Sequence, residues 1–426
     1  MEFVGTFIPD MNVRTVSGKK SSLFALFFTF AVDNLGATIV FPIFAPLFLD
    51  PNEGLLMHSV SQGFRATILG FFLAAFPLSQ LFFSPILGDY SDHAGRRRAL
   101  IVTTAMTLSG YIIAALSIQM HDLYFLFVAR LLMGIGAGNL SICMSSLSDI
   151  SDDSKQKKQY FSLGSAIAGV TFVLGPLVGG KLSDRSLSHT FHPAFPMWVG
   201  GILSAVNLLF VYFAFQETIH KTVEQKFDFL KGLKNVGSVL KTQNVRNLFI
   251  VYLLYLLAWN IFFQFLPAYL VEHFKFMSST IGDVCALLGV FWIIGTGIIY
   301  KFLHTRIPER WFLFYSLIAF ALGTLALPFL TSFVPFLICI AVCTTISGII
   351  WPLCTGAISD AADARMQGRV LGISQSVLSV SMVLAAVIGG VFLDISVVIP
   401  FFAGGLFLIG SGLLTFLCRF AEKVTN

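Results

Sequence analysis

Long apolar runs alternate with short polar segments along nearly the whole chain. A helix needs about 20 mostly apolar residues to cross the hydrocarbon core of a bilayer, and twelve runs reach that length. They fall at residues 21–49, 66–87, 99–120, 123–147, 161–183, 195–215, 245–272, 278–300, 311–329, 333–358, 368–394 and 397–418. We therefore predict an all-α polytopic membrane protein with twelve transmembrane helices.

The distribution of Lys and Arg predicts how these spans are oriented, because cytoplasmic segments of membrane proteins carry most of these residues. With both termini and every second loop assigned to the cytoplasm, 22 of the 27 Lys and Arg residues lie on that side. Arg130 lies inside a span, and the others lie on the opposite side: Arg65, Lys181, Arg185 and Lys275. We predict that both termini face the cytoplasm and that the first span is an uncleaved signal anchor.

A long polar segment, residues 216–246, separates the first six spans from the last six. Its apolar residues recur at helical spacing with lysines between them, which favours an amphipathic helix on the inner membrane surface. The stretches "GPLVGGKLSD" (175–184) and "AAVIGGVFLD" (385–394) share a Gly-Gly pair and a final Asp about half a chain apart. We therefore predict two pseudo-symmetric six-helix bundles, residues 1–215 and 247–426, that enclose one central cleft.

The composition excludes several other classes of protein. Hydrophobic residues make up 56% of the chain and charged residues 12%, an apolar excess that no soluble domain of this length needs. The net charge of +5 is small and no basic cluster is interleaved with aromatic residues, so we expect no nucleic-acid partner. The six cysteines form no C-x-x-C pair, and His189 and His192 lack a third ligand, so we expect no metal site and no cofactor.

The segment "GDYSDHAGRRRAL" (88–100) places two aspartates, a histidine and three arginines between two apolar spans. It resembles the signature G-x-L-a-D-r-x-G-R-[RK], which lies between spans 2 and 3 in the major facilitator superfamily. The residues that match are Gly88, Asp92, Gly95, Arg96 and Arg97. Tyr90 replaces the usual leucine, and His93 replaces the usual basic residue.

This resemblance implies a conformational latch on the cytoplasmic side. In the family, the aspartate matching Asp92 faces the N-terminus of span 11, where the helix dipole favours an anion. An arginine matching Arg96 or Arg97 pairs with an acid at the inner end of span 4, here Asp149. The resemblance implies that these contacts form when the cytoplasmic side is closed and break when it opens. The alternative is a solvated turn that is charged only because it touches water.

Span 4 carries "RLLMGIGAG" (130–138), which resembles the pattern R-x-x-x-G-x-G-x-[AG] of proton-coupled members of the superfamily. An arginine inside a span is costly and needs a partner. Asp33 is the only acid deep in span 1, and at about 1.5 Å of rise per residue its depth overlaps the reach of Arg130. We predict that Asp33 and Arg130 couple proton movement to transport. A purely structural pair, or a helix-packing role for Asp33, is the alternative.

Span 5 carries "GVTFVLGPLVGG" (169–180), which resembles the motif G-x(5)-G-P-x-x-G-G of the twelve-span drug:proton antiporter branch. The matching residues are Gly169, Gly175, Pro176, Gly179 and Gly180. Glycines allow helices to approach closely, and proline bends a helix. In that branch the motif closes the periplasmic side and marks exporters, so the resemblance implies export; plain helix packing is the alternative. "FQETI" (215–219) resembles the P-E-T element that ends span 6, with Gln216 in place of proline.

The central cleft needs polar and aromatic side chains that could contact a substrate. The candidates are Asn34, Asn139, Trp259, Asn260, Gln264, Trp351 and Gln375. Each of them could equally form a hydrogen bond between helices. Asp283 is a second candidate for proton coupling, although its place near the outer end of span 8 suggests a solvated helix end.

These features together predict a secondary active transporter that acts as a monomer in a bacterial inner membrane. We expect it to move a small organic solute by alternating access, in proton-coupled export. The alternative is a proton-coupled or passive importer of a nutrient such as an amino acid, a nucleoside or a sugar. No G-x-x-x-x-G-K-[ST], H-E-x-x-H or G-x-S-x-G sequence occurs, so we expect neither ATP-driven transport nor an enzyme.

The predicted orientation can be tested by labelling engineered cysteines. Lys157→Cys and Lys423→Cys should both be inaccessible to a membrane-impermeant maleimide added outside intact cells, and both should react in inside-out vesicles. The reason is the strong bias of Lys and Arg toward one side of the spans. Labelling of the two positions from opposite sides would contradict the arrangement of twelve spans with both termini in the cytoplasm.

Overall fold

The computed structural model describes residues 16–51, 55–218, 243–361 and 367–418 of the chain. Within these ranges the chain is helical and contains no strand. Twelve helical segments are long and apolar enough to cross a membrane, which confirms the twelve predicted spans. The predicted amphipathic helix in residues 216–246 falls mainly on 219–242, which lie outside the described residues.

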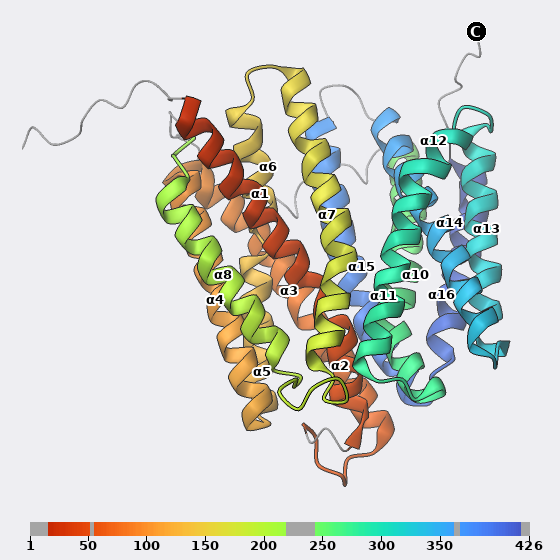
Figure 1. Ribbon diagram of the computed structural model, residues 1–426. Coiled ribbons are helices and arrows are strands. Elements are labelled where there is room, and N and C mark those ends of the chain that lie inside the picture. Colours follow the sequence, from red (N-terminus) through yellow and green to blue (C-terminus); the bar gives the residue numbers. More distant parts are fainter. Residues whose placement is uncertain (1–15, 52–54, 219–242, 362–366, 419–426) are drawn as a thin grey trace, which may run out of the picture.

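The first half of the chain supplies six of the spans and the second half supplies the other six; Figure 1 shows their helices coloured along the chain. In the first half these are α1 (Val16–Thr38), α2 (Phe41–Leu49), α3 (Gln62–Ala94), α4 (Arg96–Met120), α5 (Leu123–Gly136), α6 (Asn139–Ile150), α7 (Ser154–Ser183) and α8 (Phe195–Ala214). In the second half these are α10 (Gln243–Phe274), α11 (Ser278–Ile294), α12 (Tyr300–Leu303), α13 (Glu309–Ala326), α14 (Phe333–Asp360), α15 (Gln367–Ile395) and α16 (Ile399–Leu414). A π-helical segment, Gly295–Ile299, joins α11 to α12.

Three of the predicted spans are not continuous α-helices. The first is split into α1 and α2 just before Pro42, because proline lacks an N–H group and restricts the residue that precedes it. The fourth is split into α5 and α6 within its glycine-rich run, where a Cβ at Gly136 would overlap Thr107 of α4. The eighth contains the π-helical segment, where Gly295 lies against the backbone of Thr345 in α14.

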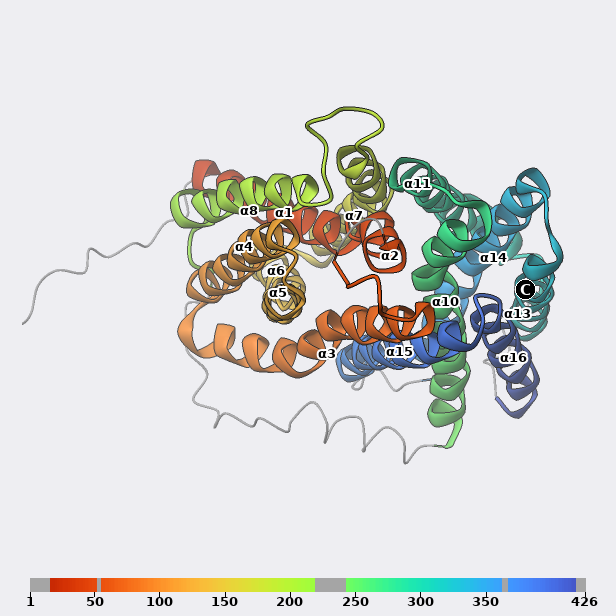
Figure 2. The ribbon, with the colours of Figure 1, turned by 90° about the horizontal axis from the view of Figure 1, so that it is seen from below.

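The two halves meet along two pairs of helices. α3 lies beside α15, and α7 lies beside α11, on opposite sides of the molecule (Figure 2). Glycines form both contacts. If Gly70 carried a side chain, its Cβ would lie only 2.6 Å from the Cα of Gly390. A Cβ added to Gly180 would likewise lie 2.8 Å from the Cα of Gly282. The absence of side chains therefore lets the backbones of the two halves touch.

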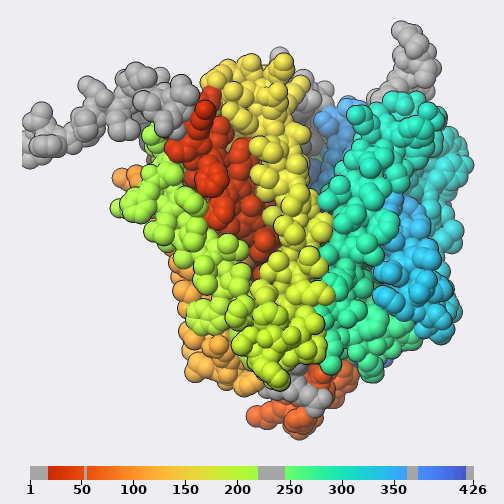
Figure 3. All heavy atoms as spheres, viewed as in Figure 1, coloured from red at the N-terminus to blue at the C-terminus, as the bar shows by residue number. Residues whose placement is uncertain are grey.

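These contacts are concentrated at one end of the bundle. We call the end at which α8 ends and α10 begins the linker end, and the end at which α7 ends and α11 begins the far end. In Figure 3, α7 (yellow) and α11 (green) touch in the lower part of the molecule, the far end, and diverge toward the top, where α15 (blue) is seen between them. The molecule is therefore closed at the far end and open toward the linker end.

A buried arginine organises the loop that follows α2 at the far end. Only 1% of the Arg65 surface is exposed. Its guanidinium donates to backbone oxygens of Met57 (2.6 Å), Leu56 (3.1 Å), Phe48 (3.2 Å) and Val60 (3.2 Å). Among the described residues, the Arg65 guanidinium is therefore satisfied by backbone carbonyl groups alone. These hydrogen bonds hold the loop against α3.

Candidate functional site

The turn between α3 and α4 is made by a single glycine. Gly95 has φ of 96°, a backbone conformation that side chains disfavour, and it ends α3 and begins α4. A Cβ at this position would also overlap the Glu217 carboxylate. This tight turn brings the charged residues of 88–97 together at the linker end.

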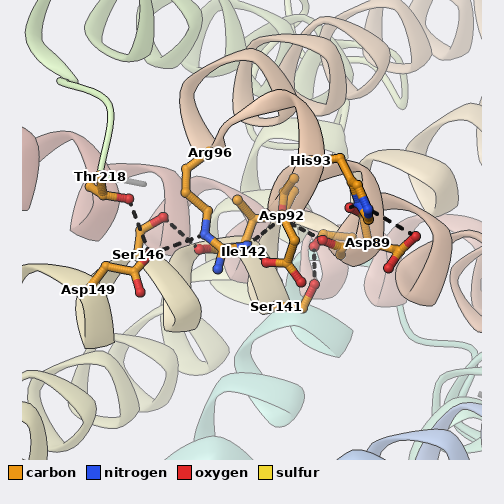
Figure 4. A network of polar contacts seen from close by, with 12 residues as sticks. Asp89, Asp92, His93, Arg96, Ser141, Ile142, Ser146, Asp149 and Thr218 are labelled. Atoms are coloured by element: carbon orange, nitrogen blue, oxygen red, sulfur yellow. Dashed lines mark hydrogen bonds and ion pairs between the residues drawn. The ribbon is translucent and has the colours of Figure 1, made fainter. Parts of the chain in front are cut away.

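Arg96 is the centre of a polar network in this turn (Figure 4). Its Nη1 lies 2.5 Å from Asp92 Oδ1 and donates to Ser91 Oγ at 2.6 Å, while its Nε lies 3.2 Å from Asp149 Oδ2. Only 7% of the residue is exposed. One guanidinium therefore joins α3, α4 and the C-terminal end of α6, and the Arg96–Asp149 pair that the family resemblance implies is present.

Two residues that the sequence analysis did not assign to the site complete this network. Glu217 accepts hydrogen bonds from the backbone N–H of Arg96 (2.9 Å) and of Arg97 (3.2 Å), so its carboxylate caps the N-terminus of α4. Thr218 Oγ1 donates to Asp149 Oδ2 at 3.3 Å. Both belong to the "FQETI" element, whose resemblance to P-E-T was the signal in the sequence.

The Arg96–Asp149 pair lies within the first half of the chain, because Arg96 begins α4 and Asp149 belongs to α6. Its expected dependence on closure of the cytoplasmic side stays a prediction. Arg97 turns instead toward α8, where it donates to the backbone oxygen of Tyr212 and lies 5.5 Å from its ring centre. The side chains of the first turn of α15, expected opposite Asp92, lie outside the described residues.

Asp33 and Arg130 do not form an ion pair in this conformation. Asp33 Oδ1 accepts a hydrogen bond from Asn139 Nδ2 at 3.4 Å, and its buried Oδ2 has no partner among the described residues. The Arg130 guanidinium lies over the rings of Phe76 (4.9 Å), Phe44 (5.4 Å) and Phe72 (5.8 Å). Aromatic faces thus stabilise the cation, and its Nε and Nη1 make no hydrogen bond to described residues.

Tyr111 of α4 connects the surroundings of these two charges. Its ring passes between α1 and α8, because a Cβ at Gly36 would overlap the hydroxyl and a Cβ at Gly200 would overlap the ring. The side chain is 1% exposed, and its hydroxyl lies within electrostatic range of both Asp33 and Arg130. Sequence reasoning missed Tyr111, because the glycines that make room for it lie on other spans.

The span 5 motif lies on two helix contacts. Gly175 and Gly179 face the end of α1, where a Cβ at either position would overlap Thr38 or Ile39. Gly180 faces the second half, where its Cβ would lie 2.5 Å from the backbone oxygen of Ser278 in α11. Pro176 is buried beside Gly175, and a Cβ at Gly169 would lie 3.3 Å from Ile293 Cδ1 of α11. The motif packs helices, and its link to export stays a prediction.

The polar candidates for the cleft differ in how far their side chains are already engaged. Asn34 donates to the backbone oxygen of Phe30 at 2.8 Å, and Asn139 accepts from Thr103. Asn260 donates to the backbone oxygen of Leu256 at 2.8 Å and to Ser381 Oγ at 3.2 Å. Gln264 is 6% exposed and its Oε1 has no partner among the described residues, whereas Gln375 is exposed.

Aromatic rings join the halves at mid-depth. Phe263 of α10 contacts Phe41 of α2 at 4.7 Å and Phe172 of α7 at 5.0 Å between ring centres. Trp259 stacks on Phe263 at 5.5 Å, and Trp292 lies 6.3 Å from Phe172. Trp351 in turn lies 6.2 Å from Trp292. Both tryptophans predicted for the cleft, Trp259 and Trp351, therefore belong to an aromatic cluster at the boundary between the halves.

Asp283, the second candidate for proton coupling, is engaged in an ion pair. Its Oδ2 lies 2.6 Å from Lys181 Nζ of the other half, and both side chains are partly exposed at the far end. Among the residues that the structure describes, no group of three His, Cys, Asp or Glu side chains could hold a metal ion.

Comparison with known proteins agrees with this architecture. The family model of the Major Facilitator Superfamily matches residues 26–308 and 248–426. The class D tetracycline resistance protein of Salmonella ordonez is 26% identical over 85% of this chain and 86% of its own length. The class H protein of Pasteurella multocida is 27% identical over 86% and 87%.

Solved structures share the fold at lower identity. A D-xylose–proton symporter matches with a TM-score of 0.71 and 13% identity over 95% of this chain and 98% of its own. The human organic anion transporter MFSD10 matches with a TM-score of 0.66 and 19% identity over 93% of this chain and 99% of its own. At these identities the likeness concerns the fold alone.

Substitution of Arg96 should slow the conformational cycle more than it weakens substrate binding. Arg96→Ala releases Asp92 and Asp149. Asp92→Asn removes the charge that we expect to face the N-terminus of α15, an interaction of about 0.3–2 kcal/mol. We expect turnover to fall severalfold while the substrate Kd changes less than twofold, measured by flux and by binding to purified protein. Arg98→Ala is the matched control, since Arg98 is exposed and its side chain forms no hydrogen bond or ion pair with described residues. Normal transport with weak binding would instead make the turn part of the substrate site.

Proposed function

Because this chain belongs to the Major Facilitator Superfamily and is a secondary transporter, we propose that it exports a small organic solute in exchange for protons. Its twelve apolar helices and its bacterial relatives make it a multi-pass protein of the inner membrane. In the proposed orientation the linker end faces the cytoplasm, as the Lys and Arg distribution predicts, and the described conformation is open toward the cytoplasm.

The observation that carries proton coupling is the state of Asp33. A carboxylate in the middle of a span is rare because hydrocarbon disfavours its charge, and such residues mark proton relays. Asp33 has one oxygen held by Asn139 and another without a partner among the described residues. Its carboxylate is therefore free to gain a proton or to receive a hydrogen-bond donor of a substrate.

Arg130 supplies the second element of the proposed switch. A nearby guanidinium favours the ionised form of a carboxylate, and low dielectric around the carboxylate favours the neutral form. Arg130 lies against three aromatic rings in this conformation and is not paired with Asp33. We assign this arrangement to the proton-loaded protein that has opened toward the cytoplasm, in which arriving substrate displaces the proton from Asp33.

The return step completes the cycle. With the cytoplasmic side closed and the far end open, substrate leaves and a proton from outside binds Asp33. Reopening toward the cytoplasm then carries the proton inward. Each turn exchanges substrate moving out for protons moving in, and the gradient of protons drives accumulation outside.

The candidate substrate is a planar, polar compound of the tetracycline type. The support is the 26–27% identity to tetracycline resistance proteins over most of the chain. The aromatic cluster of Trp259, Phe263 and Trp292 and the unpartnered Gln264 Oε1 of α10 also suit a planar, polar compound. A binding screen on the purified protein, begun with tetracycline and extended to other polycyclic compounds, identifies the ligand for the flux measurements.

Asp33→Asn should separate transport from proton coupling. The amide keeps the shape and one acceptor but cannot gain or release a proton, so a neutral substrate should still bind within about threefold of the original Kd. Uptake into inside-out proteoliposomes driven by a pH gradient should fall to the level seen without a gradient, while downhill exchange continues. Arg130→Ala should lose both coupling and stability, because a buried side chain that fills the space between three rings is removed.

Asp153→Asn is the matched control for this experiment. Asp153 is also a carboxylate of the first half, but its role is to cap α7 by accepting from the backbone N–H of Gln156 at 2.6 Å. We expect this variant to retain gradient-driven flux. Unchanged gradient-driven flux in Asp33→Asn would move the coupling site elsewhere or make the protein a facilitator. Accumulation in the opposite direction would favour a nutrient importer.

A further inference from the structure

The carboxylate of Asp184 joins the two halves at the far end. Asp184 follows the last residue of α7, and its Oδ2 accepts hydrogen bonds from the backbone N–H of Ser279 at 3.3 Å and from Ser279 Oγ. Ser279 is the second residue of α11, which belongs to the other half. The acid of one half thus caps the first turn of a helix of the other half.

The electrostatics of this contact favour the charged acid. Asp184 is only 4% exposed, and the first-turn N–H groups of α11 carry the positive end of a helix dipole. Burial raises the pKa of the Asp184 carboxyl, but hydrogen bonds from Ser186 and Ser279 outweigh burial and hold this pKa below its ordinary value. The carboxylate is therefore ionised at neutral pH, and its hydrogen bonds to Ser279 are of the strong, charge-assisted kind.

The other polar contacts between described residues of the two halves are weaker. Lys181 and Asp283 form an ion pair whose side chains are 41% and 48% exposed, so water screens it. Gln62 donates to Glu272 at 3.1 Å in an exposed position. Among these three contacts, only Asp184 contributes a carboxylate that is withdrawn from water. Removing it should therefore destabilise the closed far end more than removing either of the other two contacts.

The internal repeat places a second aspartate in the corresponding position. Asp394 ends the repeated stretch of the second half as Asp184 ends that of the first. A Cβ at Gly63, in the first turn of α3, would overlap Asp394 Oδ1, so this acid also lies against a helix start of the opposite half. Asp394 is exposed and its carboxylate bonds to no described residue. Asp184 and Asp394 thus each lie against a helix start of the opposite half, but only Asp184 is hydrogen-bonded to it.

We propose that Asp184 and Ser279 form an outer latch that holds the far end closed and must open in every transport cycle. The proposal rests on the proposed alternating access of this protein, and it adds a positioning residue that sets the balance between the two open states. Release of the latch exposes the ionised carboxylate and the first-turn N–H groups of α11 to water. The gain in hydration then offsets part of the lost hydrogen bonds.

The latch can be tested through the accessibility of the contact beneath it. Val173 of α7 lies against Gly289 of α11, closer to the middle of the molecule. In Val173→Cys protein, a membrane-impermeant maleimide added from the far-end side should react only when the far end opens. The labelling rate in right-side-out vesicles therefore follows the population of the outward-open state. Labelling by the six native cysteines is measured in parent protein and subtracted.

Asp184→Asn in the Val173→Cys background should raise the labelling rate about tenfold, equivalent to about 1.4 kcal/mol in the opening equilibrium. Ser279→Ala should raise it about threefold, and the double variant should react no faster than Asp184→Asn, because both substitutions break one interaction. Ser279→Ala keeps the test valid if Asp184→Asn protein folds poorly, since it leaves the bonds of Asp184 to Ser186 in place.

Asp122→Asn is the matched control. Asp122 is also a far-end carboxylate that caps a helix, accepting from the backbone N–H of Phe125 at 3.1 Å, but both residues belong to the first half. We expect its labelling rate to stay within twofold of the parent. An unchanged rate in both latch variants, or an equal rise in Asp122→Asn, would overturn the proposal. Because labelling needs neither substrate nor protons, failure of proton-coupled export would leave this result standing, and the reverse also holds.

Discussion

An unpartnered polar group in hydrocarbon is energetically costly, and this cost determines how the buried charges and backbone groups of the protein are paired. Inside a bilayer no water is present to bind a charge or a backbone group, so each must find its partner within the protein or lie at an end of the bundle. The helices satisfy the backbone. Three buried arginines are satisfied in three different ways: Arg65 by carbonyl oxygens, Arg96 by carboxylates and a hydroxyl, and Arg130 by aromatic rings.

These three solutions suit different roles. The guanidinium of Arg65 donates to four backbone oxygens, one in α2 and three in the segment between α2 and α3. Arg96 ties together α3, α4 and α6, and Glu217 and Thr218 of the segment after α8 belong to the same network at the linker end of the first half. Arg130 is held by contacts that have no fixed direction, and its Nε and Nη1 make no hydrogen bond to described residues. This incomplete pairing suits the proposed role of Arg130 in proton coupling.

The two ends of the bundle are built differently. The far end joins the halves through glycine contacts and through polar bonds from one half to the other, such as that of Asp184 with Ser279. The polar network described at the linker end lies within the first half. Under the proposed alternating access, opening of the far end would have to break these bonds between the halves. The rings around Phe263 lie between the two ends and form apolar contacts between the halves.

The sequence by itself determined the twelve spans, because apolar runs of spanning length have few other uses. It also located the charged turn at residues 88–100 and the resemblance to the major facilitator fold, since these depend on short stretches of neighbouring residues. The tertiary structure alone decided that α5 ends early, that Asp33 and Arg130 stay apart, and that Glu217 caps α4. It also decided that Asp184 binds across the halves. Each of these depends on which helices lie side by side and at what height, and the order of residues along one helix carries no measure of that.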